Sequence, residues 1–138
     1  MSTIARVLSI GIGITIAAFT IQAQPKPVME KGAKVYNEYC KTCHQDKGQG
    51  LGAVYPPLAK SDWLQKTKKD DVIKAVVKGL NGKIKVNGKD YNGVMAPMPA
   101  KYTAEEIAAV ITYVYNSFGN KGPTITAAEV KKVDAKRK

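Results

Sequence analysis

The sequence is poor in the side chains that build metal sites and disulfide networks. Its 138 residues include two Cys, one His, one Trp and two Phe, and Arg occurs only at positions 6 and 137. Two cysteines allow at most one bridge, and a structural zinc site needs about four ligands, usually from a second Cys or His pair. The composition therefore disfavours both a disulfide framework and structural zinc.

The few donors are gathered in one pentapeptide. Cys40-Lys41-Thr42-Cys43-His44 holds both cysteines and the single histidine. Two thiols at this spacing can add across the vinyl groups of a haem, and the following His can bind its iron, so the run is typical of covalent c-type haem attachment. A thioredoxin-like dithiol is the alternative, but it normally follows a buried strand, whereas a helical pattern precedes Cys40. The motif favours haem c.

A haem iron also needs a ligand opposite His44, and the chain has no second His. The candidates for the second iron ligand are therefore a Met sulfur, a Lys amine or water. Met1 leaves with an export signal and Met29 precedes the first helix, so the Met candidates are Met95 and Met98. A thioether favours ferrous iron, and two filled axial positions leave no place for a substrate. This predicts an electron carrier, not an enzyme, with no small-molecule substrate; water or a labile Met would instead suit a gas sensor.

Residues 1–23 have the features of an export signal. Arg6 supplies a positive start, and Val7–Ile21 is a mostly apolar stretch of 15 residues. A membrane-spanning helix needs about 20, so we expect cleavage after Ala23. Thioether attachment outside the bacterial cytoplasm agrees with a periplasmic protein. An uncleaved membrane anchor is the alternative.

The charge is strongly positive. The chain has 22 Lys and Arg against 11 Asp and Glu, a formal net charge of +11, and removal of Arg6 would leave +10. Lys is a hydrated point charge suited to long-range steering and weak docking. We therefore expect redox protein partners with acidic docking surfaces. Export disfavours nucleic acid as a partner, and membrane contact is expected only if the signal stays uncleaved.

Apolar spacing and turn residues predict a mainly helical domain at 30–120. An extended leader with two prolines should precede it at 24–29, and a basic tail or short helix should follow at 121–138. Expected helices cover 30–40, 61–65, 70–80 with Gly82 as the breaker, a segment after the Thr103 and Glu106 capping box, and 127–136. Asn87-Gly88 predicts a hairpin over 83–92, and Met95–Pro99 an irregular loop.

Together these motifs resemble a class I cytochrome c over about residues 30–120. The likeness rests on Gly32 and Tyr36, the Cys-x-x-Cys-His run, a Pro-Pro-Leu segment, the methionine loop and a last helix with Tyr113-Val114. Tyr55-Pro-Pro-Leu-Ala and Tyr91-Asn-Gly-Val-Met resemble haem domains that work with periplasmic dehydrogenases and copper nitrite reductases. The resemblance implies a small, mainly α fold packed around one covalent haem, with a short β-hairpin before the Met loop.

The resemblance also implies roles for single residues. Met95 lies 12 residues before Ile107 and 18 before Tyr113, the offsets of the distal ligand in similar cytochromes. Met98 is the alternative, because the family usually places Pro directly after the ligand and Pro99 follows Met98.

Other residues are expected around the haem. Pro56 and Leu58 match the segment whose carbonyl accepts the ring N–H of the ligating His. Trp63 and Tyr91 are candidates to bond haem propionates, with ordinary core packing as the alternative. The function predicted is a periplasmic single-electron carrier. The alternative is a haem c subunit bound tightly to a periplasmic dehydrogenase or reductase.

Overall fold

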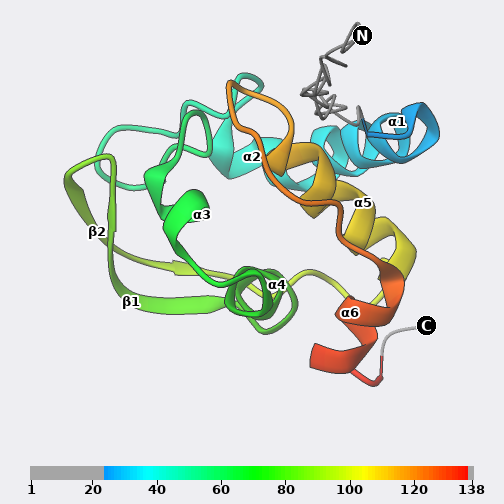
Figure 1. Cartoon of the computed structure of the whole chain (residues 1–138). Coiled ribbons are helices and arrows are strands. Elements are labelled where there is room, and N and C mark those ends of the chain that lie inside the picture. The colour runs from blue at the N-terminus through cyan, green and yellow to red at the C-terminus, as the bar shows by residue number, and fades with distance from the viewer. Residues whose placement is uncertain (1–23, 137–138) are drawn as a thin grey trace, which may run out of the picture.

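Two helices cross at the centre of the fold. A computed structural model describes residues 24–136, so the expected signal at 1–23 and Arg137 lie outside the described residues. Helix α1 (Lys26–Val35) packs against α5 (Ala104–Tyr115), as Figure 1 shows. A Cβ on Gly32 would lie 2.3 Å from the carbonyl oxygen of Ala109. The missing side chain is therefore what lets the two helices approach so closely.

The first helix leads without a break into the pentapeptide. A π-helical turn η1 (Tyr36–Cys40) follows α1, and α2 (Lys41–His44) follows that turn. The predicted extended leader at 24–29 is wrong from Lys26 onward, because α1 begins there. Pro27 is tolerated in the first helical turn, where a backbone N–H would have no partner within the helix in any case.

Two short helices come next. In α3 (Asp62–Lys66), the hydroxyl of Ser61 accepts from the backbone N–H of Leu64, so the predicted cap is present. Helix α4 (Lys69–Lys78) ends at Gly79, whose φ is 83°. Gly82 was the wrong choice of helix breaker: it lies inside the following strand.

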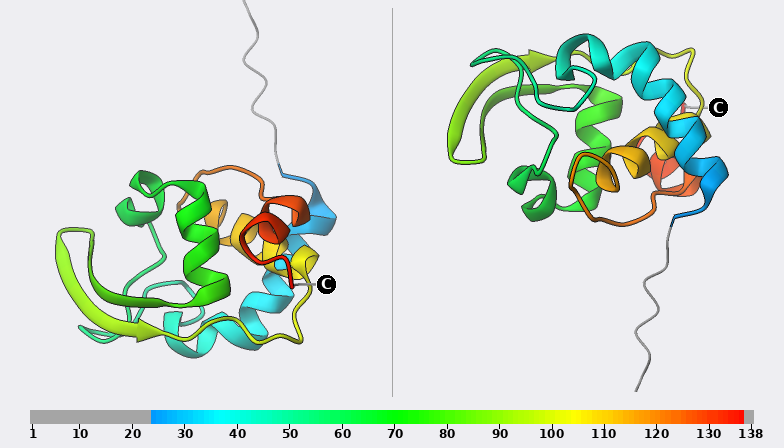
Figure 2. Two further views of the ribbon diagram at one scale, coloured as in Figure 1. Left: turned by 90° about the horizontal axis from the view of Figure 1, so that it is seen from below. Right: turned by 90° about the horizontal axis from the view of Figure 1, so that it is seen from above.

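The predicted hairpin forms and is longer than expected. Strand β1 (Leu80–Val86) pairs antiparallel with β2 (Lys89–Met95) around Asn87-Gly88, and Leu80 stands opposite Met95. The backbone N–H of Asn87 donates to Asp62 Oδ1 at 2.6 Å, and the N–H of Asp62 donates to Asn87 Oδ1 at 3.0 Å. Figure 2 shows the hairpin as an arm beside the helices. Its tip is thus fastened to α3, and Met95 is the last residue of a strand.

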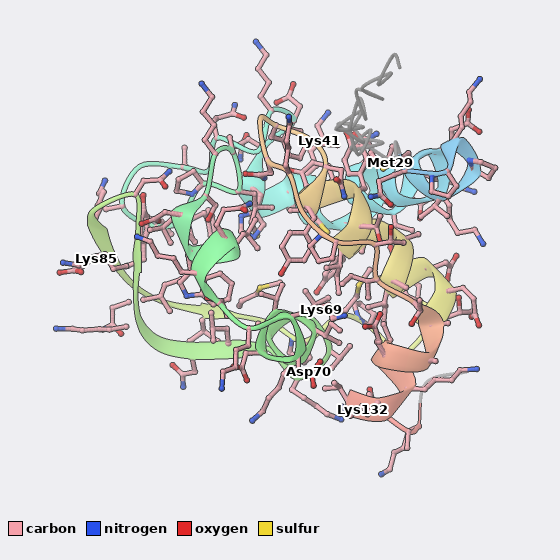
Figure 3. The ribbon with its side chains drawn as sticks, viewed as in Figure 1. Met29, Lys41, Lys69, Asp70, Lys85 and Lys132 are labelled. Atoms are coloured by element: carbon pink, nitrogen blue, oxygen red, sulfur yellow. The ribbon has the colours of Figure 1, made fainter. Side chains whose placement is uncertain are left out.

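The C-terminal segment forms a docked helix. Thr126 and Glu129 make a second capping box for α6 (Ala127–Val133), in the same way as Thr103 and Glu106 do for α5. Val130 on α6 is fully buried. Three ion pairs join α4 to this segment: Lys69–Glu129, Lys132–Asp70 at 3.3 Å and Lys78–Asp134 at 3.1 Å. Lys69, Asp70 and Lys132 are labelled in Figure 3.

The architecture confirms the predicted fold class, mainly helical with one small hairpin. The predicted inward residues of α5 are buried with the core: Ile107, Val110, Ile111 and Val114. Within residues 24–136, no helix combines the length and the apolar character needed to cross a membrane.

Candidate haem-binding site

One continuous helical stretch positions both thiols and the imidazole. Cys40 is the last residue of η1, and Cys43 and His44 end α2. Residues three and four apart on a helix share a face, so all three side chains point to the same side. That side is hollow: Cys40 and His44 line two adjoining cavities, and Cys43 lines the larger of them.

The His44 imidazole is held in one orientation. Its Nδ1 lies 3.0 Å from the carbonyl oxygen of Pro56, and the residue is 8% exposed. A carbonyl can only accept, so Nδ1 carries the proton and the lone pair of Nε2 is left for a metal. Burial lowers the pKa of His44, and the bond to Pro56 opposes this. The ring is therefore a neutral, oriented base, as an iron ligand must be.

The two cavities form one central cavity. The larger encloses about 320 Å³ and the smaller about 100 Å³. They share seven lining residues from η1, α2, the proline segment and the hairpin: Tyr39, Cys40, His44, Pro56, Leu80, Ile84 and Met95. The smaller part is walled mainly by apolar side chains, including Val110, Ile111 and Val114 of α5. Its lining suits a largely apolar group that presents a metal to His44.

The two candidate methionines lie in different surroundings. Met95 is half-buried at the end of β2 and lines both parts of the central cavity. Met98 is 2% exposed, belongs to the hydrophobic core and lines only the smaller part. Its backbone N–H donates to the carbonyl of Val76 at 2.9 Å. Met95 therefore shares more of the cavity with His44 than Met98 does.

The surroundings of the thiols argue against a reactive dithiol. Burial raises the pKa of the Cys40 thiol to about 11. Reactive redox cysteines have lowered pKa values, because the thiolate is the nucleophile. In the part of the chain that the structure describes, no group of three or more His, Cys, Asp or Glu side chains is placed to hold a metal ion. The zinc alternative therefore has no site there.

Comparison with known proteins decides the family. The profile of the family described as cytochrome c matches residues 29–117, which is more than half of the chain. The chain belongs to the cytochrome c family. Cytochromes c carry covalent haem c with its iron and are electron-transfer proteins rather than enzymes, in agreement with the sequence predictions.

Individual cytochromes are similar over most of the described chain. Cytochrome c-552 of Thermus thermophilus is 38% identical over 131 residues, covering 89% of this chain and 87% of that protein. The cytochrome c subunit of a quinone alcohol dehydrogenase from Gluconacetobacter polyoxogenes is 31% identical over 104 residues, 74% of this chain and 22% of the subunit. A fructose dehydrogenase cytochrome subunit of Gluconobacter japonicus is 30% identical over 110 residues, 75% of this chain and 22% of the subunit.

The cytochrome fold brings all the predicted site residues to the central cavity. Cys43 and Tyr91 line the larger part, and Leu58 and Trp63 line the smaller. Tyr91 is 6% exposed, and the ammonium of Lys89 lies 5.6 Å from its ring centroid. Propionate contacts of Trp63 and Tyr91 stay a prediction.

Sequence reasoning missed two contributors to the cavity. Tyr39 lines both parts, donates its hydroxyl to the Pro97 carbonyl at 3.3 Å and packs against Tyr102. Nothing in the local sequence distinguishes it from other helix aromatics. The second contributor is the wall formed by β1. The sequence does carry a signal for it, because Leu80, Ile84 and Val86 keep the two-residue period of one strand face.

Proposed function

We propose that the chain is a periplasmic electron-transfer protein in which Cys40 and Cys43 hold one haem as thioethers and His44 and Met95 are the axial ligands. The observation that carries this is the lining of one cavity by all four side chains. The haem would supply an iron that changes its oxidation state by a single electron. The protein's own part is to fix the ligand geometry and to keep water away from it.

The neutral His44 ring and a half-buried Met95 support this assignment. Pro56 holds the proton on Nδ1, so Nε2 is the nitrogen presented to the cavity. The strand pairing of Met95 with Leu80 fixes the backbone of the second ligand. With His44 and Met95 as ligands from two separate segments, a bound haem iron would have no open position for a substrate. An outer-sphere carrier fits this arrangement better than a gas sensor does.

An exposed apolar patch beside the cavity is our candidate for the docking surface. Leu51, Val54 and Val94 are 54%, 62% and 74% exposed, and Val54 and Val94 also line the larger part of the cavity. The loop and strand that carry them adjoin, since the Lys89 ammonium donates to the carbonyl of Gly52 at 3.0 Å. Figure 2 shows this loop running next to β2.

Lysines border the patch. Lys47 and Lys89 are exposed on the same loop and strand, and Lys41 is exposed on α2 next to the thiols. Asp46 and Asp90 are exposed on the same loop and strand, so the border is mixed, with an excess of lysine. A small apolar centre within such a border complements an acidic redox protein, with the charges governing encounter more than affinity. We therefore propose that an acidic redox partner docks here, over the edge of the cavity.

A free carrier is favoured over a subunit of a larger complex. Of the three relatives, the Thermus cytochrome c-552 is the more similar at 38% identity, against 31% and 30% for the two dehydrogenase subunits. In the subunit alternative, the basic segment 131–138 would dock onto the larger complex, but two of its lysines pair within the chain: Lys131 with Glu105 at 3.9 Å and Lys132 with Asp70. The periplasmic location rests on the signal-like residues 1–23 and on the bacterial source of the relatives.

Native purification tests this function. Periplasm and membranes are separated, and each fraction is followed by haem staining and by absorption before and after dithionite. The proposal expects a monomeric, periplasmic, haem-staining protein that is reduced and reoxidised reversibly. Stoichiometric co-purification with a dehydrogenase would establish the subunit alternative, and absence of haem from the chain would reject both.

A further inference from the structure

We propose that Asn120 is a positioning residue for the His44 imidazole, acting through the segment Pro56–Ser61. The inference rests on the proposed haem ligation by His44. Asn120 follows α5 and lies three residues beyond the range matched by the cytochrome c profile, which ends at 117. The contacts of its side chain are what point to this role.

The side chain of Asn120 has three backbone partners and is 7% exposed. Its Nδ2 donates to the carbonyl oxygens of Leu58 at 2.7 Å and of Val114 at 3.0 Å. Its Oδ1 accepts from the backbone N–H of Ser61 at 3.1 Å. Because carbonyls only accept and a backbone N–H only donates, these partners fix which end of the amide is which. The amide thus ties the end of α5 to two points of the segment.

The segment needs such a partner because it lies outside helices and strands. Residues 56–60 have no regular secondary structure, so their backbone groups have no ladder of their own. Leu58 and Ala59 donate to the carbonyl of Gly48 at 2.7 and 2.8 Å, and Lys60 donates to that of Phe118 at 3.1 Å. The side chain of Asn120 provides partners for the Leu58 carbonyl and the Ser61 N–H. Ser61 is 1% exposed, so its N–H has no access to water in place of Asn120.

The segment in turn orients the imidazole. The Pro56 carbonyl that accepts from His44 Nδ1 lies two residues before the Leu58 carbonyl held by Asn120. The ring of Pro57 fixes one of the torsions between these two carbonyls, its φ, and the Leu58 N–H is held by Gly48, so rotation between them is restricted. A displacement of Leu58 is therefore passed on to the Pro56 carbonyl. A longer, weaker bond there makes the ligating imidazole less basic, which favours ferrous iron.

The test compares Asn120→Ala and the milder Asn120→Ser with Thr112→Val in the haem-loaded protein. Thr112 is fully buried, and its hydroxyl accepts from the Ile125 N–H at 2.8 Å, so Thr112→Val removes a buried bond without a link to the segment. Three quantities are measured for each protein: the midpoint of thermal unfolding, the reduction potential, and the solvent exchange rate of the His44 Nδ1 proton by NMR.

Both Asn120 variants should raise the reduction potential and speed the solvent exchange of the His44 Nδ1 proton. For Asn120→Ala the exchange rate should rise about tenfold, the effect of losing roughly one hydrogen bond. Thr112→Val should lower the unfolding midpoint alone. Asn120 variants that lose stability but keep the parent potential and exchange rate would overturn the proposal. A parent protein without covalent haem would reject the ligation itself, a different result that is visible before any variant is made.

Discussion

Gly32 of α1 lies directly against Ala109 of α5, so that a Cβ at position 32 would come within 2.3 Å of the Ala109 carbonyl oxygen and 2.6 Å of Tyr113 Cβ. Both neighbours belong to the helix that walls the cavity from behind. The contact therefore joins α1, which leads into Cys40 and Cys43, to α5, which lines the smaller part of the central cavity.

Replacing Gly32 by Ala should lower the free energy of unfolding by about 1–3 kcal/mol, because the helices must separate to admit the methyl group. Lys31→Ala is the control, since Lys31 is the preceding residue of the same helix and is exposed. Denaturant titration of both variants measures the difference. Equal stability of Gly32→Ala and Lys31→Ala would contradict the close crossing.

The docking of α6 should weaken in acid. The hydrogen bond from Lys69 holds the pKa of the Glu129 carboxyl below its usual range, and the Thr126 N–H acts in the same direction. The folded pKa is the lower one, so this stabilisation is fully present above the unfolded value, about 4.3, and is lost as the pH falls through the folded value.

Both side chains of the pair are partly exposed, so its contribution to stability should be small. Glu129→Gln keeps the acceptor of the capping box and removes only the charge. We expect the thermal midpoint of the parent protein to exceed that of Glu129→Gln near neutral pH, with the gap closing in acid. A gap that is independent of pH would assign the effect to capping geometry.

Met95 is expected to be the distal ligand. Met95→Ala should abolish the weak far-red absorption of Met-ligated ferric haem and lower the reduction potential, because the thioether favours ferrous iron. Met98→Ala serves as the companion variant and should leave both nearly intact while reducing stability, since Met98 is 2% exposed in the core. Loss of the far-red band in Met98→Ala alone would reassign the ligand.

Electron transfer with the native partner should slow steeply as salt rises. Screening shortens the reach of surface charges to about 8 Å at physiological ionic strength. Lys89→Gln should reduce the salt dependence of the stopped-flow rate, and Val94→Ser should slow the reaction at every salt concentration. Lys136→Gln is the charge control, because α6, the helix that precedes it in the chain, lies on the side away from the hairpin (Figure 1). Rates that are insensitive to salt would show that the lysines only maintain solubility.

Signals confined to a few neighbouring residues predicted much of this fold. The Asn87-Gly88 turn, the Ser61 cap and the Thr103–Glu106 capping box each have their partners within a few residues, and all form as predicted. The Cys-x-x-Cys-His spacing is equally local, and it brings Cys40, Cys43 and His44 to one cavity. Such features depend little on the rest of the chain.

Features set by distant residues were not predictable. Gly79 and Gly82 are equally good helix breakers in sequence, but a Cβ on Gly79 would lie 2.6 Å from the Met95 carbonyl. Only the return of β2 past the end of α4 creates that constraint. Asn120 is likewise an ordinary loop residue until the fold sets it beside Leu58, 62 positions earlier in the chain.

Covalent attachment of one haem through Cys40 and Cys43 is the central claim, and intact mass spectrometry after acid-acetone extraction measures it most directly. The natively expressed chain should keep its haem through extraction and show the mass of a polypeptide beginning near Gln24 plus one haem. The Cys40→Ala, Cys43→Ala double variant should carry no haem after the same treatment. Haem that extracts freely from the parent chain, leaving the bare polypeptide mass, would contradict the account.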